Sequence, residues 1–173
     1  PAGASAAPPP PTTGKSEDFA PSEMLKTGVF YVLWFMYACG AGAGLMIIAK
    51  LAAIAKVQMG ITWGFMLVAA LAIGNGSGRI IAGMASDKIG RKTTLFVCFV
   101  FQAILMVLVS RVEQGGSMAG MGAMAVISAL IGANYGANLS LFPSLTKDYY
   151  GLKNFGVNYG LVFTAWGAGG FVL

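Results

Sequence analysis

Arg79 is a charged side chain inside a long apolar part of the sequence. Residues 74–95 read GNGSGRIIAGMASDKIGRKTTL, and apolar runs lie on both sides of them. The chemistry that such an arginine offers is anion recognition, because a planar guanidinium binds a carboxylate through two parallel hydrogen bonds. Two other interpretations stay open: Arg79 pairs with an acidic residue elsewhere in the protein, or it reaches a nearby polar surface.

The composition indicates what surrounds this arginine. The chain has 173 residues, of which 57% are hydrophobic and 10% are charged, and its mean hydropathy is +0.74. Soluble domains carry roughly 25% charged residues. Apolar runs of about 20 residues match the roughly 30 Å core of a bilayer, and such runs span it as helices because lipid offers the backbone no hydrogen bonds. We therefore predict an all-α, polytopic transmembrane helix bundle embedded in a lipid bilayer.

Five apolar runs are long enough to be spans. We predict spans over residues 28–49, 61–86, 93–110, 117–142 and 155–173. Residues 1–26 are rich in Pro, Ala and Ser, and we predict that they form a disordered linker or tail, with the transmembrane bundle over residues 27–173. Small residues four apart allow helices to approach closely in lipid, and the pairs Gly40/Gly44 and Gly156/Gly160 have that spacing.

The charged residues predict the orientation of the chain in the membrane. The net charge is +5, but the basic residues lie in short segments between spans, so we interpret them as topology signals and predict no nucleic-acid partner. If the N-terminal tail is cytoplasmic, the inside set has seven basic residues: Lys15, Lys26, Lys88, Arg91, Lys92, Lys147 and Lys153. The outside set then has three: Lys50, Lys56 and Arg111. This bias favours a cytoplasmic tail and a cytoplasmic loop at residues 83–92.

Arg79 projects from a particular face of its predicted helix. At 3.6 residues per turn, the residues that share this face are all small apart from the arginine: Ala72, Gly76, Arg79, Gly83 and Ser86. Asn75 borders the same face. We predict that this face lies in the bundle interior, where a central arginine, which costs roughly 2.5–3.5 kcal/mol to insert, marks a substrate path.

A compact motif follows the arginine. Its residues, which we call the signature loop, are Gly83, Asp87, Lys88, Gly90, Arg91 and Lys92. This spacing between two apolar runs resembles the loop between the second and third spans of a half in the major facilitator superfamily of secondary transporters. The resemblance implies twelve spans in two six-span halves, a substrate site between the halves, and a role for the loop in conformational gating.

A second stretch narrows the resemblance. Residues 142–171, FPSLTKDYYGLKNFGVNYGLVFTAWGAGGF, are similar to the oxalate–formate antiporter family between its tenth and eleventh spans. The resemblance implies that the chain supplies five spans of the C-terminal half, that the missing N-terminal half is its partner, and that Arg79 binds a substrate carboxylate. Asn75 stands where related monocarboxylate transporters have an aspartate. In the oxalate–formate antiporter family, oxalate transport implies a second cation, a lysine in the eleventh span. Residues 155–173 contain no lysine, so the sequence favours a monocarboxylate such as formate, lactate or pyruvate.

These observations lead to one functional prediction and its alternatives. We predict part of a secondary transporter in the cell membrane that moves a small organic anion by alternating access, with Arg79, Asn75, Tyr135 and Trp166 at the substrate. A tyrosine hydroxyl or an indole N–H adds a donor to an apolar wall, although packing or a membrane-interface belt also explains these aromatic residues. The alternatives are a membrane sensor or accessory protein that binds the anion, and an anion channel. The sequence has no histidine, nucleophile–base pair or metal cluster, so we predict no enzyme, cofactor or metal.

Overall fold

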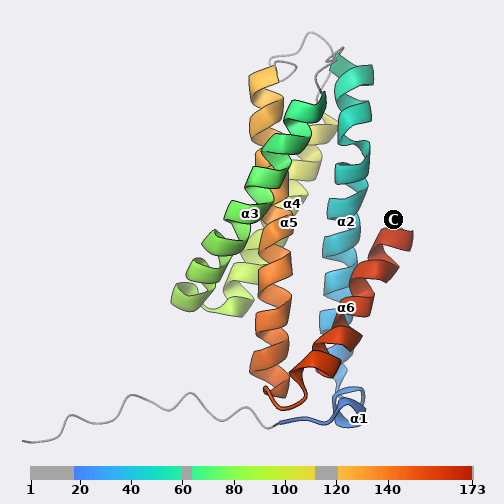
Figure 1. The fold of residues 1–173 in the computed structure, drawn as a ribbon, viewed down its shortest axis with the longest axis vertical. Coiled ribbons are helices and arrows are strands. Elements are labelled where there is room, and N and C mark those ends of the chain that lie inside the picture. Colours follow the sequence, from blue (N-terminus) through green and yellow to red (C-terminus); the bar gives the residue numbers. More distant parts are fainter. Residues whose placement is uncertain (1–17, 60–63, 112–120, 173) are drawn as a thin grey trace, which may run out of the picture.

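The structure is a computed structural model that describes residues 18–59, 64–111 and 121–172. Every regular element in these residues is a helix: α1 (Pro21–Met24), α2 (Gly28–Met59), α3 (Gly64–Ile89), α4 (Arg91–Ser110), α5 (Met121–Tyr150) and α6 (Phe155–Val172) (Figure 1). Four helices of the described residues are long and apolar enough to cross a membrane, namely α2 to α5. The fifth predicted span is the helix α6, which has 18 residues and is not among these four.

Two helices extend further than the sequence predicted. The α2 helix continues from the first span to Met59, through residues that the sequence left outside a span. The α5 helix runs past the predicted end of the fourth span at residue 142, through Pro143 to Tyr150. A membrane helix tolerates a proline where side-chain hydroxyls and neighbouring helices satisfy the backbone. Ser144 lies in this turn and donates a hydrogen bond to the Ser140 carbonyl, 2.9 Å away.

The α3 and α5 helices are in close backbone contact through glycines. Gly74 and Gly78 of α3 lie against the backbone of Ala129 and Ala133, while Gly132 and Gly136 of α5 lie against the backbone of α3. A Cβ atom at any of these four glycines would overlap a carbonyl oxygen of the facing helix. Because the contact is reciprocal and made by backbone, α3 and α5 form one closely packed pair.

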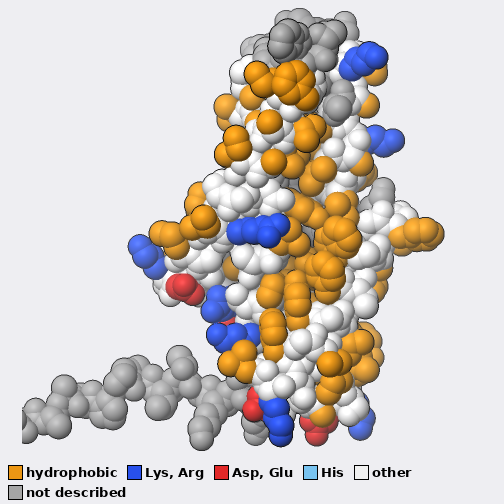
Figure 2. Space-filling model, viewed as in Figure 1, with side chains coloured by type: hydrophobic (Ala, Val, Ile, Leu, Met, Phe, Trp, Pro, Cys, Tyr) orange, Lys and Arg blue, Asp and Glu red, His pale blue; other side chains and the backbone are white. Residues whose placement is uncertain are grey.

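A second helix pair is formed by α2 and α6. Gly169 of α6 lies against the backbone of Ala38 in α2, and the Trp34 indole donates a hydrogen bond of 2.9 Å to the Thr164 hydroxyl. The α4 helix packs on α5 and α3, behind them in the view of Figure 1. Apolar side chains are spread over the face seen in Figure 2, while Lys and Arg gather toward the end that carries α1.

The N-terminal segment differs from the predicted linker. Residues 1–17 lie outside the described residues, but residues 18–26 pack under the turn between α5 and α6. The Asp18 carboxylate accepts hydrogen bonds from the backbone N–H groups of Leu152 and Lys153, at 3.0 and 3.1 Å. Met24 in α1 is fully buried. The prediction of disorder up to residue 26 missed this contact because its polar partners lie more than 130 positions further along the chain.

Candidate substrate-binding site

Arg79 lies on an exposed face of α3. The small residues Gly76 and Gly83 share this face, and a Cβ atom at either would meet nothing within 4 Å. The residues of α3 that are buried in the described bundle are Leu67, Leu71, Gly74, Gly78, Ala82 and Ser86, of which only Ser86 belongs to the predicted Arg79 face. Within the described residues the rest of that face is open, and its place in the interior of an assembled bundle stays a prediction.

Asn75 positions the arginine. Its side-chain oxygen accepts a hydrogen bond from Arg79 Nε, at 3.2 Å and one helical turn away. The backbone of Gly136 in α5 lies against Asn75, and a Cβ atom at position 136 would be 2.8 Å from Asn75 Oδ1. This contact uses Nε, so the two terminal nitrogens of the guanidinium remain as donors for a carboxylate.

Tyr135 and Trp166 meet directly, as two helices bring them together. The Trp166 indole N–H donates a hydrogen bond to the Tyr135 hydroxyl, at 2.6 Å, joining α6 to α5. The Tyr135 ring lies over Gly44 of α2, where a Cβ atom would be 2.6 Å from the ring. Glycine at position 44 is thus required for the ring to occupy its place, and the predicted small pair Gly40/Gly44 serves side-chain packing.

Two further tyrosines belong to the same region. The Tyr37 and Tyr159 hydroxyls are 3.5 Å apart, and the Tyr37 ring stacks on Phe142 with centroids 4.1 Å apart. The sequence interpretation missed Tyr37. One signal could have found it, because Tyr37 is three residues before Gly40 and seven before Gly44, on the small-residue face of α2.

A buried polar chain lies beside this site. Gln102 of α4 donates a hydrogen bond to the Gly40 carbonyl at 3.0 Å and accepts one from the Asn134 amide at 3.2 Å. Asn134 therefore links α5 to α4 and, through Gln102, to α2. Hydrogen bonds between helices are a common use of buried amides in lipid, where each pair contributes on the order of 1 kcal/mol.

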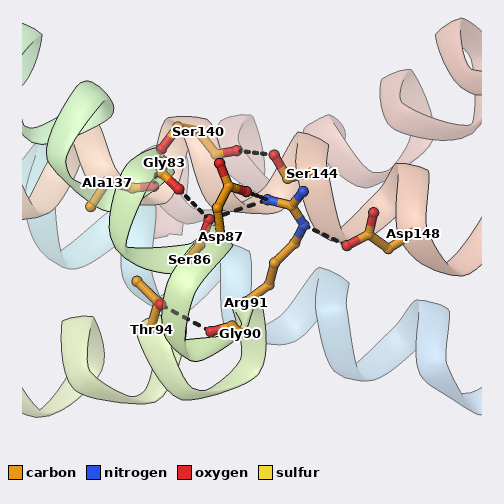
Figure 3. Close-up of polar contacts among 10 residues, drawn as sticks. All are labelled: Gly83, Ser86, Asp87, Gly90, Arg91, Thr94, Ala137, Ser140, Ser144 and Asp148. Atoms are coloured by element: carbon orange, nitrogen blue, oxygen red, sulfur yellow. Dashed lines mark hydrogen bonds and ion pairs between the residues drawn. The ribbon is translucent and has the colours of Figure 1, made fainter. Parts of the chain in front are cut away.

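The signature loop connects three helices (Figure 3). Arg91 forms an ion pair and hydrogen bond with Asp148 near the end of α5, and its Nη1 atom lies 3.7 Å from the Asp87 carboxylate and 3.2 Å from the Ser86 hydroxyl. Gly90 joins α3 to α4 with a φ of +86°, in the left-handed region that favours glycine. The sharp turn at Gly90 thus brings Arg91 back over the end of α3.

The remaining loop residues do not enter the ion pairs. Gly83 faces open space, Lys88 is exposed, and the Lys92 ammonium lies over the Tyr149 ring, 5.4 Å from its centroid. The ion-paired part of the loop begins at Asp87, eight residues after Arg79 (87 − 79), so the two features are separate along α3. The first is an exposed cation, and the second fastens the ends of α3, α4 and α5.

The groups around Arg79 can act as ligands for an anion. Among the described residues, no carboxylate pairs with Arg79. No group of three or more potential metal ligands occurs in the described parts of the chain. A guanidinium can bind a small planar anion, because it supplies a charge and paired hydrogen-bond donors.

Comparison with known proteins decides the family. The family model described as Major Facilitator Superfamily matches residues 3–173. The chain belongs to the Major Facilitator Superfamily. This confirms the resemblance carried by the signature loop, and with the four apolar helices it makes the protein a multi-pass membrane protein of a transporter family.

Two curated relatives are similar to this superfamily member. The oxalate:formate antiporter of Oxalobacter formigenes is 30% identical over 151 residues, which cover 86% of the chain and 35% of the relative. The uncharacterized MFS-type transporter YhjX of Escherichia coli (strain K12) is 26% identical over 157 residues, covering 88% of the chain and 37% of the relative. The chain thus spans little more than a third of the length of these relatives.

Proposed function

We propose that the chain is part of a carrier for a small monocarboxylate and that Arg79 binds the carboxylate. The observation that carries this proposal is the exposed guanidinium on α3, which pairs with no carboxylate of the described residues and is held by a hydrogen bond to Asn75. The similarity to a protein named as an oxalate:formate antiporter supports an anionic substrate. A single cation balances one carboxylate, which favours formate, lactate or pyruvate over oxalate.

The open face of α3 supports a second part of the proposal. In a chain that covers about a third of its relatives, the exposed face with Arg79, Gly76 and Gly83 is the surface that the N-terminal half of the carrier would cover. The substrate then lies between the two halves, and the interior position predicted for Arg79 applies to the assembled carrier. Asn75 has no ionisable proton, so the Asn75–Arg79 pair provides no site for proton loading.

The signature loop supports a mechanism of alternating access. Its Arg91–Asp148 and Arg91–Asp87 contacts hold the ends of α3, α4 and α5 together at the end of the bundle that also carries α1. We propose that this end is cytoplasmic, as the bias of seven basic residues against three indicates. A cysteine placed at Lys153 in the full-length protein should react with a membrane-impermeant maleimide only when the cytoplasmic side is exposed. Reaction from outside the cell would show that the chain has the opposite orientation.

The test of the substrate proposal uses the full-length protein in proteoliposomes. We expect Arg79→Gln and Arg79→Lys to reduce uptake of labelled formate by about 10- to 100-fold, since a hydrogen bond to a charged group contributes roughly 1.5–3 kcal/mol. Arg111→Gln is the matched control, because Arg111 is exposed at the far end of α4. Uptake that survives Arg79→Gln unchanged would refute the role of Arg79.

The same preparation separates the alternative function. A membrane sensor built on this fold would bind formate, and the binding would be measured as a shift in unfolding temperature. It would not exchange formate across the bilayer. An anion channel would carry current far above the turnover of a carrier. Parallel assays with formate, lactate and oxalate then define the substrate, and faster exchange of oxalate than of any monocarboxylate would contradict the one-cation argument.

A further inference from the structure

A small cavity lies between α2, α4 and α5, beside the buried chain of carboxamides. Its volume is about 10 Å³. A water molecule needs roughly 10–15 Å³ of such space, so the cavity has the size of a single water site. Apart from Gln102, Asn134 and Tyr135, every described residue that lines the cavity is glycine or aliphatic.

The hydrogen bonds of the two carboxamides fix their orientation. The Gly40 carbonyl can only accept, so the Gln102 group that faces it at 3.0 Å is the N–H donor. The Gln102 oxygen is then the acceptor for the Asn134 amide N–H, at 3.2 Å. This arrangement leaves the side-chain oxygen of Asn134, which accepts no hydrogen bond from the described residues, although Asn134 is only 5% exposed.

The walls of the cavity supply no donor to this oxygen. The aliphatic residues and the glycine have no side-chain N–H or O–H, and the Tyr135 hydroxyl lies at the Trp166 indole, 2.6 Å away. The backbone N–H groups at these mid-helix positions belong to the helical ladder. A buried carbonyl without a partner costs about 1–3 kcal/mol, so a ligand that donates a hydrogen bond would be stabilised in the cavity.

The chemistry of the cavity selects water as that ligand. A buried water makes about two to four hydrogen bonds, and the oxygens of Asn134 and Gln102 are acceptors with lone pairs to spare. A hard cation takes about six oxygen ligands, whereas this cavity is small and no carboxylate lines it. An anion would face the two carboxamide oxygens and is excluded by repulsion.

We propose that the cavity binds one ordered water molecule, which donates hydrogen bonds to the side-chain oxygens of Asn134 and Gln102. The water completes a polar chain that runs from α5 through α4 to the Gly40 carbonyl of α2. Its role is to satisfy the Asn134 oxygen at a depth where lipid offers no donor. The site is independent of the proposed substrate, because Arg79 does not line the cavity.

The test is a structure of the full-length protein in a lipid nanodisc, at a resolution that shows ordered water. We expect a density peak at about 2.5–3.0 Å from both oxygens, which stays when sodium in the buffer is replaced by choline. A map that shows water elsewhere in the bundle but none in the cavity would overturn the proposal. A peak with about six oxygens at about 2.0–2.6 Å would also overturn it, because that coordination identifies a cation.

A pair of variants tests whether Asn134 builds the site. Asn134→Leu removes one of the two acceptors and should abolish magnetisation transfer from water to the Gln102 side-chain amide, measured by solid-state NMR in bilayers. Asn138→Leu is the matched control: Asn138 lies one turn further along α5, is 2% exposed and also has unpaired amide atoms, but does not line the cavity. We expect this control to keep the transfer. Loss of transfer in both variants, or in neither, would contradict the site.

Discussion

The glycine contact between α3 and α5 allows one substitution to be judged quantitatively. A Cβ atom at Gly74 would lie 2.7 Å from the carbonyl carbon of Ala129, and closer still to its oxygen. Carbon atoms attract each other at separations of about 3.5–4.0 Å, so Gly74→Ala would force the helices apart by roughly 1 Å. Overpacking of this kind costs about 1–3 kcal/mol. The facing atoms are backbone, so no side chain can rotate away to relieve the overlap.

Gly76→Ala is the matched control for this prediction. Gly76 lies two residues along the same helix, and a Cβ atom there would meet nothing within 4 Å. Both substitutions gain about 1 kcal/mol of helix propensity in a helix interior, so their difference isolates the packing cost. We expect Gly74→Ala to give a lower unfolding temperature of the full-length protein in detergent than Gly76→Ala, because position 76 does not face the backbone of α5. Equal unfolding temperatures for the two variants would refute the close contact between α3 and α5.

Three further predictions concern individual contacts. A double-mutant cycle of Arg91→Gln and Asp148→Asn should give a coupling of about 0.5–1 kcal/mol in detergent unfolding, since both side chains are partly exposed; additive effects would exclude the ion pair. Tyr135→Phe should destabilise by about 1–3 kcal/mol, because the Trp166 N–H loses its acceptor; an unchanged unfolding temperature would contradict that bond. Asp18→Asn should speed proteolysis near the turn between α5 and α6, because the amide accepts the two N–H bonds less strongly; an unchanged cleavage rate would count against the contact.

Features that depend on one segment of sequence were predictable. Arg79 and the signature loop were found because a charge in an apolar run, and a loop motif between two spans, are visible without knowledge of neighbouring helices. The glycine pairs show the opposite case. The sequence interpretation selected Gly156 and Gly160, which face open space in the described structure, while the closest contacts use Gly74 and Gly132. Which small face meets another helix depends on the rotation of both helices, and a single segment does not contain that information.

The same reason explains what was missed around the site. Tyr37 looks like one more aromatic residue in an apolar run, and only its contacts with Phe142 and Tyr159 place it beside the others. The end of α5 was missed because proline usually ends a helix in water. In lipid the cost of ending a helix is higher, since exposed backbone groups find no water, and α5 therefore continues to the polar residues Lys147 and Asp148.

The candidate site lies across the seam between the two closely packed helix pairs. Asn75, Arg79 and Tyr135 belong to α3 and α5, whose backbones are in direct contact, while Tyr159 and Trp166 belong to α6, which packs on α2. The pairs are joined at the site by the hydrogen bond from the Trp166 indole to the Tyr135 hydroxyl, while the contact between Tyr37 and Tyr159 lies within the α2–α6 pair. A hydrogen bond of this kind can be replaced by one to a ligand at little net cost, since it contributes only about 1 kcal/mol to the free energy of folding. An anion held by Arg79 on one side and by an indole or phenol on the other would therefore link the two helix pairs. Its binding free energy would then stabilise one relative position of the pairs. The glycine contacts would keep α3 and α5 together as the pairs move.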